Sequence, residues 1–443
     1  MEFKEAIISC DTVVALPNST SNNTTIFGKN SDRPKLECQP LIQKPRIKNQ
    51  SKYTECQFIK IPSTKISYAH VGSKPFWCWG YEHGFNEYQV VIGNEGLGTH
   101  VPSSPSRKLI GMEIVRLALE RSKNAKEAVK VITDLVSTFG QGVFENNHNI
   151  RTYDNGYLIA DPKEAYIIET AGHEWAVKKV KDTEGISNIH SIESNWDNIS
   201  DTAINTAKSL NLHIDSPKLN FAKTFCDYDS RYDGRGEFRR LRSCTYLQNL
   251  KSNINVKEII FILKDHSDGE NSNISQNFLD SRTICMHYPD SNSDSDGNTA
   301  ASLVSELHSD NSQLDIHWTS MYSPCLGIFI PMFIEGEIPE ILSIGNKNYN
   351  PKSPWWSFRS IEESCRTEGM LDNDKASEIR KIWEPIQNEF YKSAKSIARN
   401  ANQLKQNNKL NQMNEELTQY MLKNTNTVLS TLNELVKSKS QIS

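Results

Sequence analysis

The segment CDTVVALP, residues 10–17, is the first strand-like run of the sequence. It opens with Cys-Asp-Thr and continues as a short apolar run typical of a buried strand. In one interpretation Cys10 is a small hydrophobic residue, because free cysteine is among the most buried residue types. In the other, the Ser9–Cys10 bond is a cleavage site and Cys10 becomes a new N-terminus. The segment alone leaves both interpretations open.

Composition excludes several classes of protein. The chain of 443 residues has a formal net charge of -4, so it offers no overall basic field and we expect no nucleic-acid partner. No stretch approaches the ~18 uninterrupted apolar residues of a membrane span. The opening MEFKE lacks the positive charge of a signal peptide. Nine cysteines stand singly without CxxC pairs, which indicates reduced thiols in a cytoplasmic protein. We therefore expect neither metal nor cofactor.

The order of expected elements indicates an α+β protein. Strand-like runs fill the first hundred residues, and apolar periodicity predicts two helices around residues 112–119 and 125–136. Residues 156–180 are typical of an antiparallel meander. From residue 373 the composition is helical, and we expect a solvated extension broken at Pro385. This order favours layered antiparallel sheets over a doubly wound parallel sheet.

The segment FGKNSDRP, residues 27–34, carries charges unusual for a strand end. A cysteine nucleophile needs a cation to stabilise its thiolate and a carboxylate to orient its base, and Lys29 and Asp32 supply these groups. The alternative is a turn capped by an Asx side chain.

Two further segments offer polar groups. In HGFNEYQVV, Asn86 precedes a strand and could donate to a tetrahedral oxyanion, or it could belong to an ordinary Gly-x-Asn turn. In GEFRRLRSCTYL, residues 236–247, Arg239 and Arg242 share one face of a predicted helix. They could bind a carboxylate or complete a site, or they could be a solvated basic face.

Two patterns resemble functional motifs without matching them. NSDSDGNTAASL, residues 292–303, has the spacing of a calcium loop but carries Leu303 where a bidentate Glu is required. In CMH, residues 285–287, Cys285 and His287 alternate on one strand face and could form a catalytic pair. A structural histidine is the favoured interpretation.

Taken together, these segments resemble the secernins, a branch of the cysteine dipeptidase family within the N-terminal nucleophile hydrolases. The resemblance runs from about residue 8 to 330 and weakens beyond. The matching segments, besides CDTVVALP, FGKNSDRP and CMH, are WCWGYEHGFNEYQVVIGNEG (77–96), GMEIVRLALERSKNAKEAVKVITDLVSTFGQG (111–142) and YLIADPKEAYIIETAGHEWAV (157–177).

The resemblance implies an αββα sandwich, with two antiparallel sheets between helical layers. It also implies a propeptide at residues 1–9, a hydrolase domain over residues 10–370 and a helical extension over residues 371–443. Cys10 would supply the thiol nucleophile, and its freed α-amine, with a pKa near ~8, the general base.

By position, the resemblance implies that Asp32 is the carboxylate near the nucleophile and Asn86 an oxyanion-hole amide. Arg239 corresponds to a later active-site arginine. Lys29 stands where the acylase branch usually has Arg, and an ammonium is not a bidentate guanidinium.

A second oxyanion donor is expected near SNIHS, and the choice between Asn188 and His190 stays open. The resulting hypothesis is a cysteine hydrolase of amide bonds, a dipeptidase acting on a small peptide. Two alternatives are an acylase that cleaves N-acyl amides and a non-catalytic regulator of exocytosis. A homo-oligomer is compatible with the sequence.

Overall fold

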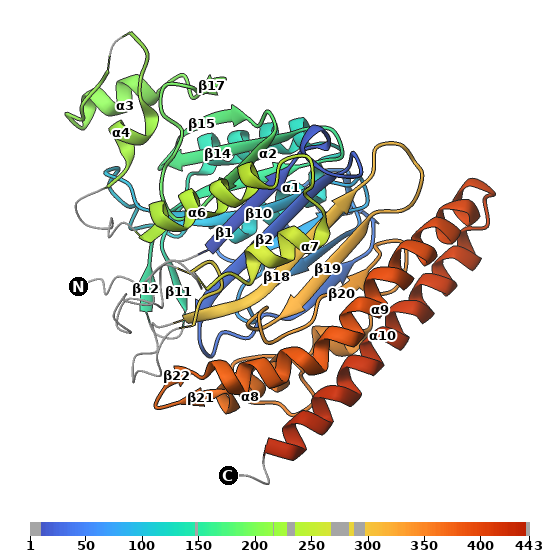
Figure 1. Cartoon of the computed structure of the whole chain (residues 1–443). Helices are drawn as coiled ribbons and strands as arrows, with labels where there is room; N and C mark the ends of the chain where they lie inside the picture. The colour runs from blue at the N-terminus through green and yellow to red at the C-terminus, as the bar shows by residue number, and fades with distance from the viewer. Residues whose placement is uncertain are drawn as a thin grey trace.

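The computed structural model describes residues 10–146, 149–215, 217–227, 235–266, 283–287 and 297–439. Two antiparallel sheets stack face to face, and helices cover the outer face of each sheet (Figure 1). The predicted fold class, an α+β protein with an αββα arrangement, is confirmed. The predicted propeptide, residues 1–9, and the aspartates of the calcium-like loop lie outside the described residues.

The first sheet has six strands in the order β16-β1-β2-β18-β19-β20. The predicted hairpin forms at its centre, where Cys10 pairs with Ser31 and Ala15 with Ile26. Every residue of β1 is buried because one face meets helices and the other meets the second sheet. The strands are β1 (Cys10–Ala15), β2 (Thr25–Pro34), β16 (Thr183–Ile186), β18 (Gly297–Leu307), β19 (Ile316–Met321) and β20 (Ile330–Met332).

The second sheet has eight strands in the order β17-β15-β14-β13-β10-β9-β8-β3. Its middle contains the predicted meander, β13-β14-β15, beside the strand predicted at QVVIGNEG. The strands are β3 (Leu41–Lys44), β8 (His70–Ser73), β9 (His83–Asn86), β10 (Val91–Leu97), β13 (Asp154–Ala160), β14 (Ala165–Ala171), β15 (Glu174–Lys179) and β17 (Asn198–Ile199).

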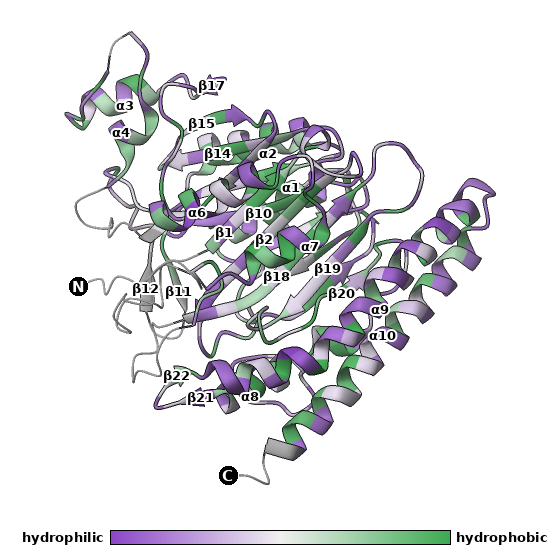
Figure 2. Ribbon diagram, viewed as in Figure 1, coloured by the Kyte–Doolittle hydropathy of each residue, from purple (hydrophilic) through white to green (hydrophobic). Residues whose placement is uncertain are grey.

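Four helices form the two outer layers. Helices α6 (Arg235–Asn249) and α7 (Val256–Leu263) pack on the first sheet, and α1 (Gly111–Arg121) and α2 (Ala125–Phe139) pack on the second. Asn124 caps α2 by accepting a 2.8 Å hydrogen bond from the Glu127 nitrogen. Gly140 ends α2 at φ +64°, a conformation that glycine adopts without steric cost. Figure 2 shows hydrophobic residues along the central strands, and hydrophobic and hydrophilic residues mixed on the helices.

The C-terminal helices pack on the domain instead of standing in solvent. Helices α9 (Asn373–Gln406) and α10 (Leu410–Lys439) form a long antiparallel pair against β20 and α8 (Pro354–Ser364) (Figure 1). Trp383, Phe390 and Leu417 are buried in the main core cluster. The predicted break at Pro385 is wrong, since α9 continues through it. Burial on both sides of the proline stabilises a helix that lacks one backbone hydrogen bond.

A glutamine side chain of α9 satisfies the backbone beside β20. Phe329, the residue before this strand, donates from its nitrogen to Oε1 of Gln387 at 2.8 Å. Nε2 of Gln387 donates back to the Phe329 carbonyl at 3.0 Å. The carboxamide therefore makes the pair of bonds that a neighbouring strand would make.

The remaining elements are short. They are α3 (Ala203–Ser209), α4 (Phe221–Phe225), the 3-10 turns η1 (Pro17–Ser19) and η3 (Glu340–Ser343), and the two-stranded pairs β4 (Ile47–Lys48) with β7 (Ile66–Ser67), β5 (Tyr53–Glu55) with β6 (Lys60–Pro62), β11 (Phe144–Asn146) with β12 (Asn149–Arg151), and β21 (Arg366–Thr367) with β22 (Met370–Leu371). Among the described residues, every helix is too short or too polar to cross a membrane.

Candidate active site

Cys10 is the first residue of β1 and lies at the end of a central strand. Its side chain is buried, and its main-chain nitrogen donates a 2.7 Å hydrogen bond to Oδ1 of Asn188. Asn188 is held in turn by a 2.9 Å bond from its Nδ2 to the Gly96 carbonyl at the end of β10. The two sheets and the segment after β16 therefore meet at the nitrogen of Cys10.

The thiol of Cys10 is surrounded by charges. Burial raises the pKa of this thiol well above its ordinary range, and the Lys29 ammonium opposes the shift. The carboxylates of Glu82, Asp32 and Glu95 raise the pKa further. The thiol is therefore protonated at rest, and a nucleophilic role requires a base in contact with it.

Lys29 joins the two sheets. Its side chain is fully buried and donates to the Asn94 carbonyl at 2.6 Å and to Oε1 of Glu95 at 3.2 Å. Burial alone would lower the pKa of Lys29, but Cys10, Glu95 and Glu82 together raise it above its usual value. The ammonium therefore keeps its charge near the nucleophile. The hydroxyl of Thr12 donates to the same oxygen of Glu95.

Asp32 follows Ser31, the β2 partner of Cys10, and is also buried. Its Oδ1 accepts a 2.6 Å hydrogen bond from the hydroxyl of Thr299 on β18. Thr299 also accepts a 2.9 Å bond from the nitrogen of Met286. The carboxylate is thus fixed in place and close enough to act on the pKa of Cys10.

Arg239 reaches from α6 to the start of β1. It is 1% exposed, and its Nε donates to Oδ2 of Asp11 at 2.9 Å. Its Nη2 donates to Oγ of Ser187 at 2.9 Å and to Oδ1 of Asn188 at 2.8 Å. Burial raises the pKa of Asp11 to about 6, with Arg239 opposing the shift. One guanidinium therefore orders both Asp11 and the amide that binds the Cys10 nitrogen. Arg242, three residues on, binds Asp265 instead.

Asn86 does not have the contacts of an oxyanion donor. Both hydrogens of its amide go to main-chain carbonyls, those of Leu119 and Ser122, each at 2.8 Å. Its Oδ1 accepts from the nitrogens of Tyr88 and Val90. The two Nδ2 bonds tie the turn after β9 to the end of α1, and the two Oδ1 bonds close the turn itself. The structure therefore gives Asn86 a structural role, because no amide hydrogen is left to meet a developing charge.

His190 also lies apart from the nucleophile network. Its Nε2 is 3.1 Å from the Thr170 carbonyl on β14, and its ring bonds Cys226. Burial lowers the pKa of His190, but Cys226 and Glu169 outweigh it and bring the pKa to about 9. Of the two residues left open near SNIHS, Asn188 is the one that the structure places beside Cys10.

Sequence patterns missed several members of this site. Asp11 stands next to the nucleophile, and Glu95 is a charge inside the buried strand β10. A buried charge within a strand is itself a signal, because such a group needs a partner. Tyr153 adds a half-buried phenol, and burial raises the pKa of this phenol, with a smaller effect from Cys10. No local spacing connects Tyr153 with Cys10.

Part of the chain matches a protein-family model. Residues 84–238 match Peptidase family C69. That segment includes Glu95, Tyr153 and Asn188, and it ends one residue before Arg239.

Several solved structures are similar at low identity. Conjugated bile acid hydrolase from Clostridium perfringens is 14% identical, with a TM-score of 0.41 over 70% of this chain and 89% of that chain. Penicillin V acylase from Agrobacterium tumefaciens is 14% identical, with a TM-score of 0.38 over 73% and 86%. The Caenorhabditis elegans ortholog of N-acylethanolamine-hydrolyzing acid amidase is 12% identical, with a TM-score of 0.32 over 67% and 92%.

Proposed function

We propose that this protein is a cysteine hydrolase of amide bonds that acts after removal of residues 1–9. The observation that carries the proposal is the network around the Cys10 nitrogen. The half-buried carboxamide of Asn188 accepts a hydrogen bond from the main-chain nitrogen that opens a central strand, and the buried Arg239 holds that carboxamide in place. A buried internal amide needs only one acceptor, whereas a freed α-amine that acts as a base must also be held in one orientation.

The chemistry follows from the pKa values of the two groups. The buried thiol keeps its proton, while a free α-amine has a pKa near ~8 and accepts a proton at neutral pH. The amine takes the thiol proton as Sγ attacks the substrate carbonyl. The tetrahedral intermediate then collapses, the C–N bond breaks, and the amine gives its proton to the leaving nitrogen. Water hydrolyses the resulting thioester and regenerates the thiol.

The substrate class that we propose is a dipeptide. The match of residues 84–238 to a peptidase family supports this, as does the resemblance to the secernin branch of the cysteine dipeptidases. We propose a cytoplasmic location on the pattern of single cysteines.

The test combines intact-protein mass with a panel of dipeptides and N-acyl amides. We expect the purified protein to begin at Cys10 and to hydrolyse dipeptides faster than acyl amides. Cys10→Ala should remove the activity, and Cys38→Ser, which alters another buried cysteine, should keep it.

Three results contradict parts of the proposal. Full-length protein that is active removes the α-amine mechanism. Preferred cleavage of acyl amides replaces the dipeptidase with an acylase. Protein that begins at Cys10 and hydrolyses nothing in the panel favours the non-catalytic regulator.

A further inference from the structure

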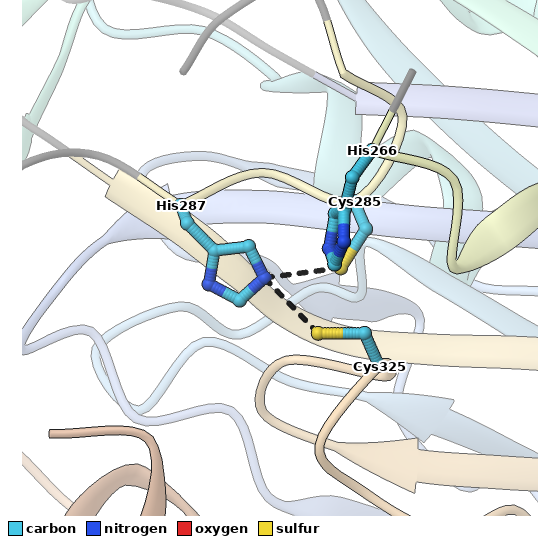
Figure 3. A group of neighbouring side chains, drawn as sticks. All are labelled: His266, Cys285, His287 and Cys325. Atoms are coloured by element: carbon cyan, nitrogen blue, oxygen red, sulfur yellow. Dashed lines mark hydrogen bonds between the residues drawn. The ribbon is translucent and has the colours of Figure 1, made fainter. Parts of the chain in front are cut away.

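Four side chains converge beside β18, separate from the Cys10 network. They are His266, Cys285, His287 and Cys325 (Figure 3). Nε2 of His287 lies 3.1 Å from Sγ of Cys325 and 3.4 Å from Sγ of Cys285. The ring of His266 stands edge-on to that of His287, with centroids 5.1 Å apart. One ligand atom from each residue falls within 4.8 Å of all the others.

These separations approach those of a tetrahedral zinc site. Zinc binds sulfur at about 2.3 Å and imidazole nitrogen at about 2.0–2.1 Å, so the ligand atoms of a tetrahedron stand roughly 3.3–3.8 Å apart. The two His287–sulfur distances lie near this range. The longest separation must shorten by only about 1 Å, which a side-chain rotation supplies. Two thiolates and two imidazoles form a Cys2His2 set that leaves no open position, as in a structural site.

The ring nitrogen of His287 that faces away from the two sulfurs is bonded to a carboxylate, as in many zinc sites. Nδ1 of His287 lies 3.1 Å from Oε1 of Glu362 on α8. A carboxylate on the far nitrogen of a metal-bound histidine fixes the ring and its tautomer. Glu362 is nearly fully buried and is itself paired with Arg366 at 2.6 Å. This arrangement presents Nε2, with its lone pair, toward the two sulfurs.

The charges balance once a divalent cation is present. Two thiolates neutralise the ion, and Arg366 neutralises Glu362. Metal binds the thiolate form, so a proton that remains on either sulfur is released when the ion enters. A cavity of about 530 Å³ between α7 and α9 has His266 and Cys325 in its wall, so an ion can reach the cluster from that side.

The position in the fold suits a structural role. His266 follows α7, Cys285 and His287 precede β18, and Cys325 lies between β19 and β20. We propose that these four residues bind one zinc ion that ties these segments together. Of the four ligands, sequence analysis singled out only the Cys285–His287 pair, because the ligands are separated by 19, 2 and 38 positions, without a CxxC pair.

The proposed zinc site also supports the active site through one relay. Met286, between two of the ligands, donates from its nitrogen to the hydroxyl of Thr299, and that hydroxyl donates to Asp32. The Thr299 nitrogen donates back to the Met286 carbonyl at 3.1 Å. A zinc ion bound to Cys285 and His287 would fix the position of Met286 between them. Through Met286 and Thr299, the ion would then help to position the carboxylate of Asp32.

The experiment measures metal in the protein as it is purified with a reductant. Elemental analysis should find about one zinc per chain. After chelation, cobalt(II) should bind and show thiolate charge-transfer and tetrahedral ligand-field absorption. Cys325→Ser and His287→Gln should lose at least tenfold in metal affinity. Cys38→Ser, which alters a buried cysteine outside the cluster, should keep one zinc.

Protein that carries no zinc and takes up no cobalt overturns the proposal. A bond between Cys285 and Cys325, seen as a loss of two hydrogens in the intact mass, also overturns it. If Cys325→Ser fails to fold, the wild-type protein still decides, because chelation must lower its melting temperature and added zinc must restore it. These readouts need no substrate, so they stand apart from the proposed hydrolase activity.

Discussion

Oδ1 of Asn188 accepts hydrogen bonds from both the main-chain nitrogen of Cys10, at 2.7 Å, and Nη2 of Arg239, at 2.8 Å. The guanidinium fixes the carboxamide, and the carboxamide fixes the nitrogen. A freed amine in this place would keep one N–H on Asn188 and turn its lone pair elsewhere. Its orientation would therefore be set before any substrate arrives.

Replacing Asn188 by Ala removes the acceptor that orients this nitrogen. We expect kcat to fall roughly 100-fold, because a small misplacement of a reacting group costs about that factor. KM should change little, since the amide acts on the base and not on the substrate. Steady-state kinetics on the processed protein measure both. A loss confined to KM would place Asn188 in substrate binding.

Asn86 offers the contrasting substitution. Asn86→Ala breaks four buried hydrogen bonds, each worth about 1 kcal/mol, so the free energy of unfolding should fall by roughly 2–4 kcal/mol. Turnover per folded molecule should stay near the wild-type value. Urea denaturation and active-site titration separate the two quantities. Unchanged stability with lost turnover would restore Asn86 as an oxyanion donor.

Asp32→Asn tests the carboxylate without removing its hydrogen-bond acceptor. The Asn side chain can still accept from Thr299, so the melting temperature should shift little. Activity should fall roughly 100-fold or more if the charge orients proton transfer at Cys10. The matched control is Thr299→Val, which keeps the charge and removes its hydrogen bond. Equal activity of Asp32→Asn and wild type would reduce Asp32 to a structural residue.

Stability should fall with rising pH through the titration of Glu95. Burial raises the pKa of Glu95 to about 7, from 4.5, while Lys29 opposes the shift. The folded chain therefore binds this proton more tightly than the unfolded chain. The stability that this proton supplies is complete below pH 4.5 and is lost as the pH rises through about 7.

Urea denaturation between pH 4 and 8 checks this expectation. Glu95→Gln should flatten the decline in unfolding free energy relative to wild type, and Glu415→Gln, at an exposed position of α10, should not. A steeper decline in Glu95→Gln would mean that Lys29 holds the carboxylate ionised throughout.

Local patterns predicted the elements that depend on near neighbours. The hairpin of β1 and β2 and helices α1 and α2 follow from alternation and periodicity within a few residues, and all of them form. The packing of α9 and α10 against the domain was not predictable, because an amphipathic helix does not reveal which surface covers its apolar face.

The residues of the candidate site also divide into those that local sequence could predict and those that only the tertiary fold brings together. Lys29 and Asp32 lie on the strand next to Cys10, so one hairpin brings them together. Asp11 and Arg239 are 228 positions apart, and only the tertiary fold makes them partners. Local sequence leaves the role of Asn86 open, since a Gly-x-Asn before a strand describes a turn as well as an oxyanion donor.

The hydrogen bonds of the Gln387 carboxamide bear on whether molecules of this protein aggregate. An open strand edge is a template on which a second chain can add its own strand, and such pairing leads to fibres and aggregates. At Phe329 both backbone groups are already taken by Gln387, and the adjoining helices cover the strand that follows. The α9–α10 pair therefore blocks the pairing of a second molecule's strand with this edge.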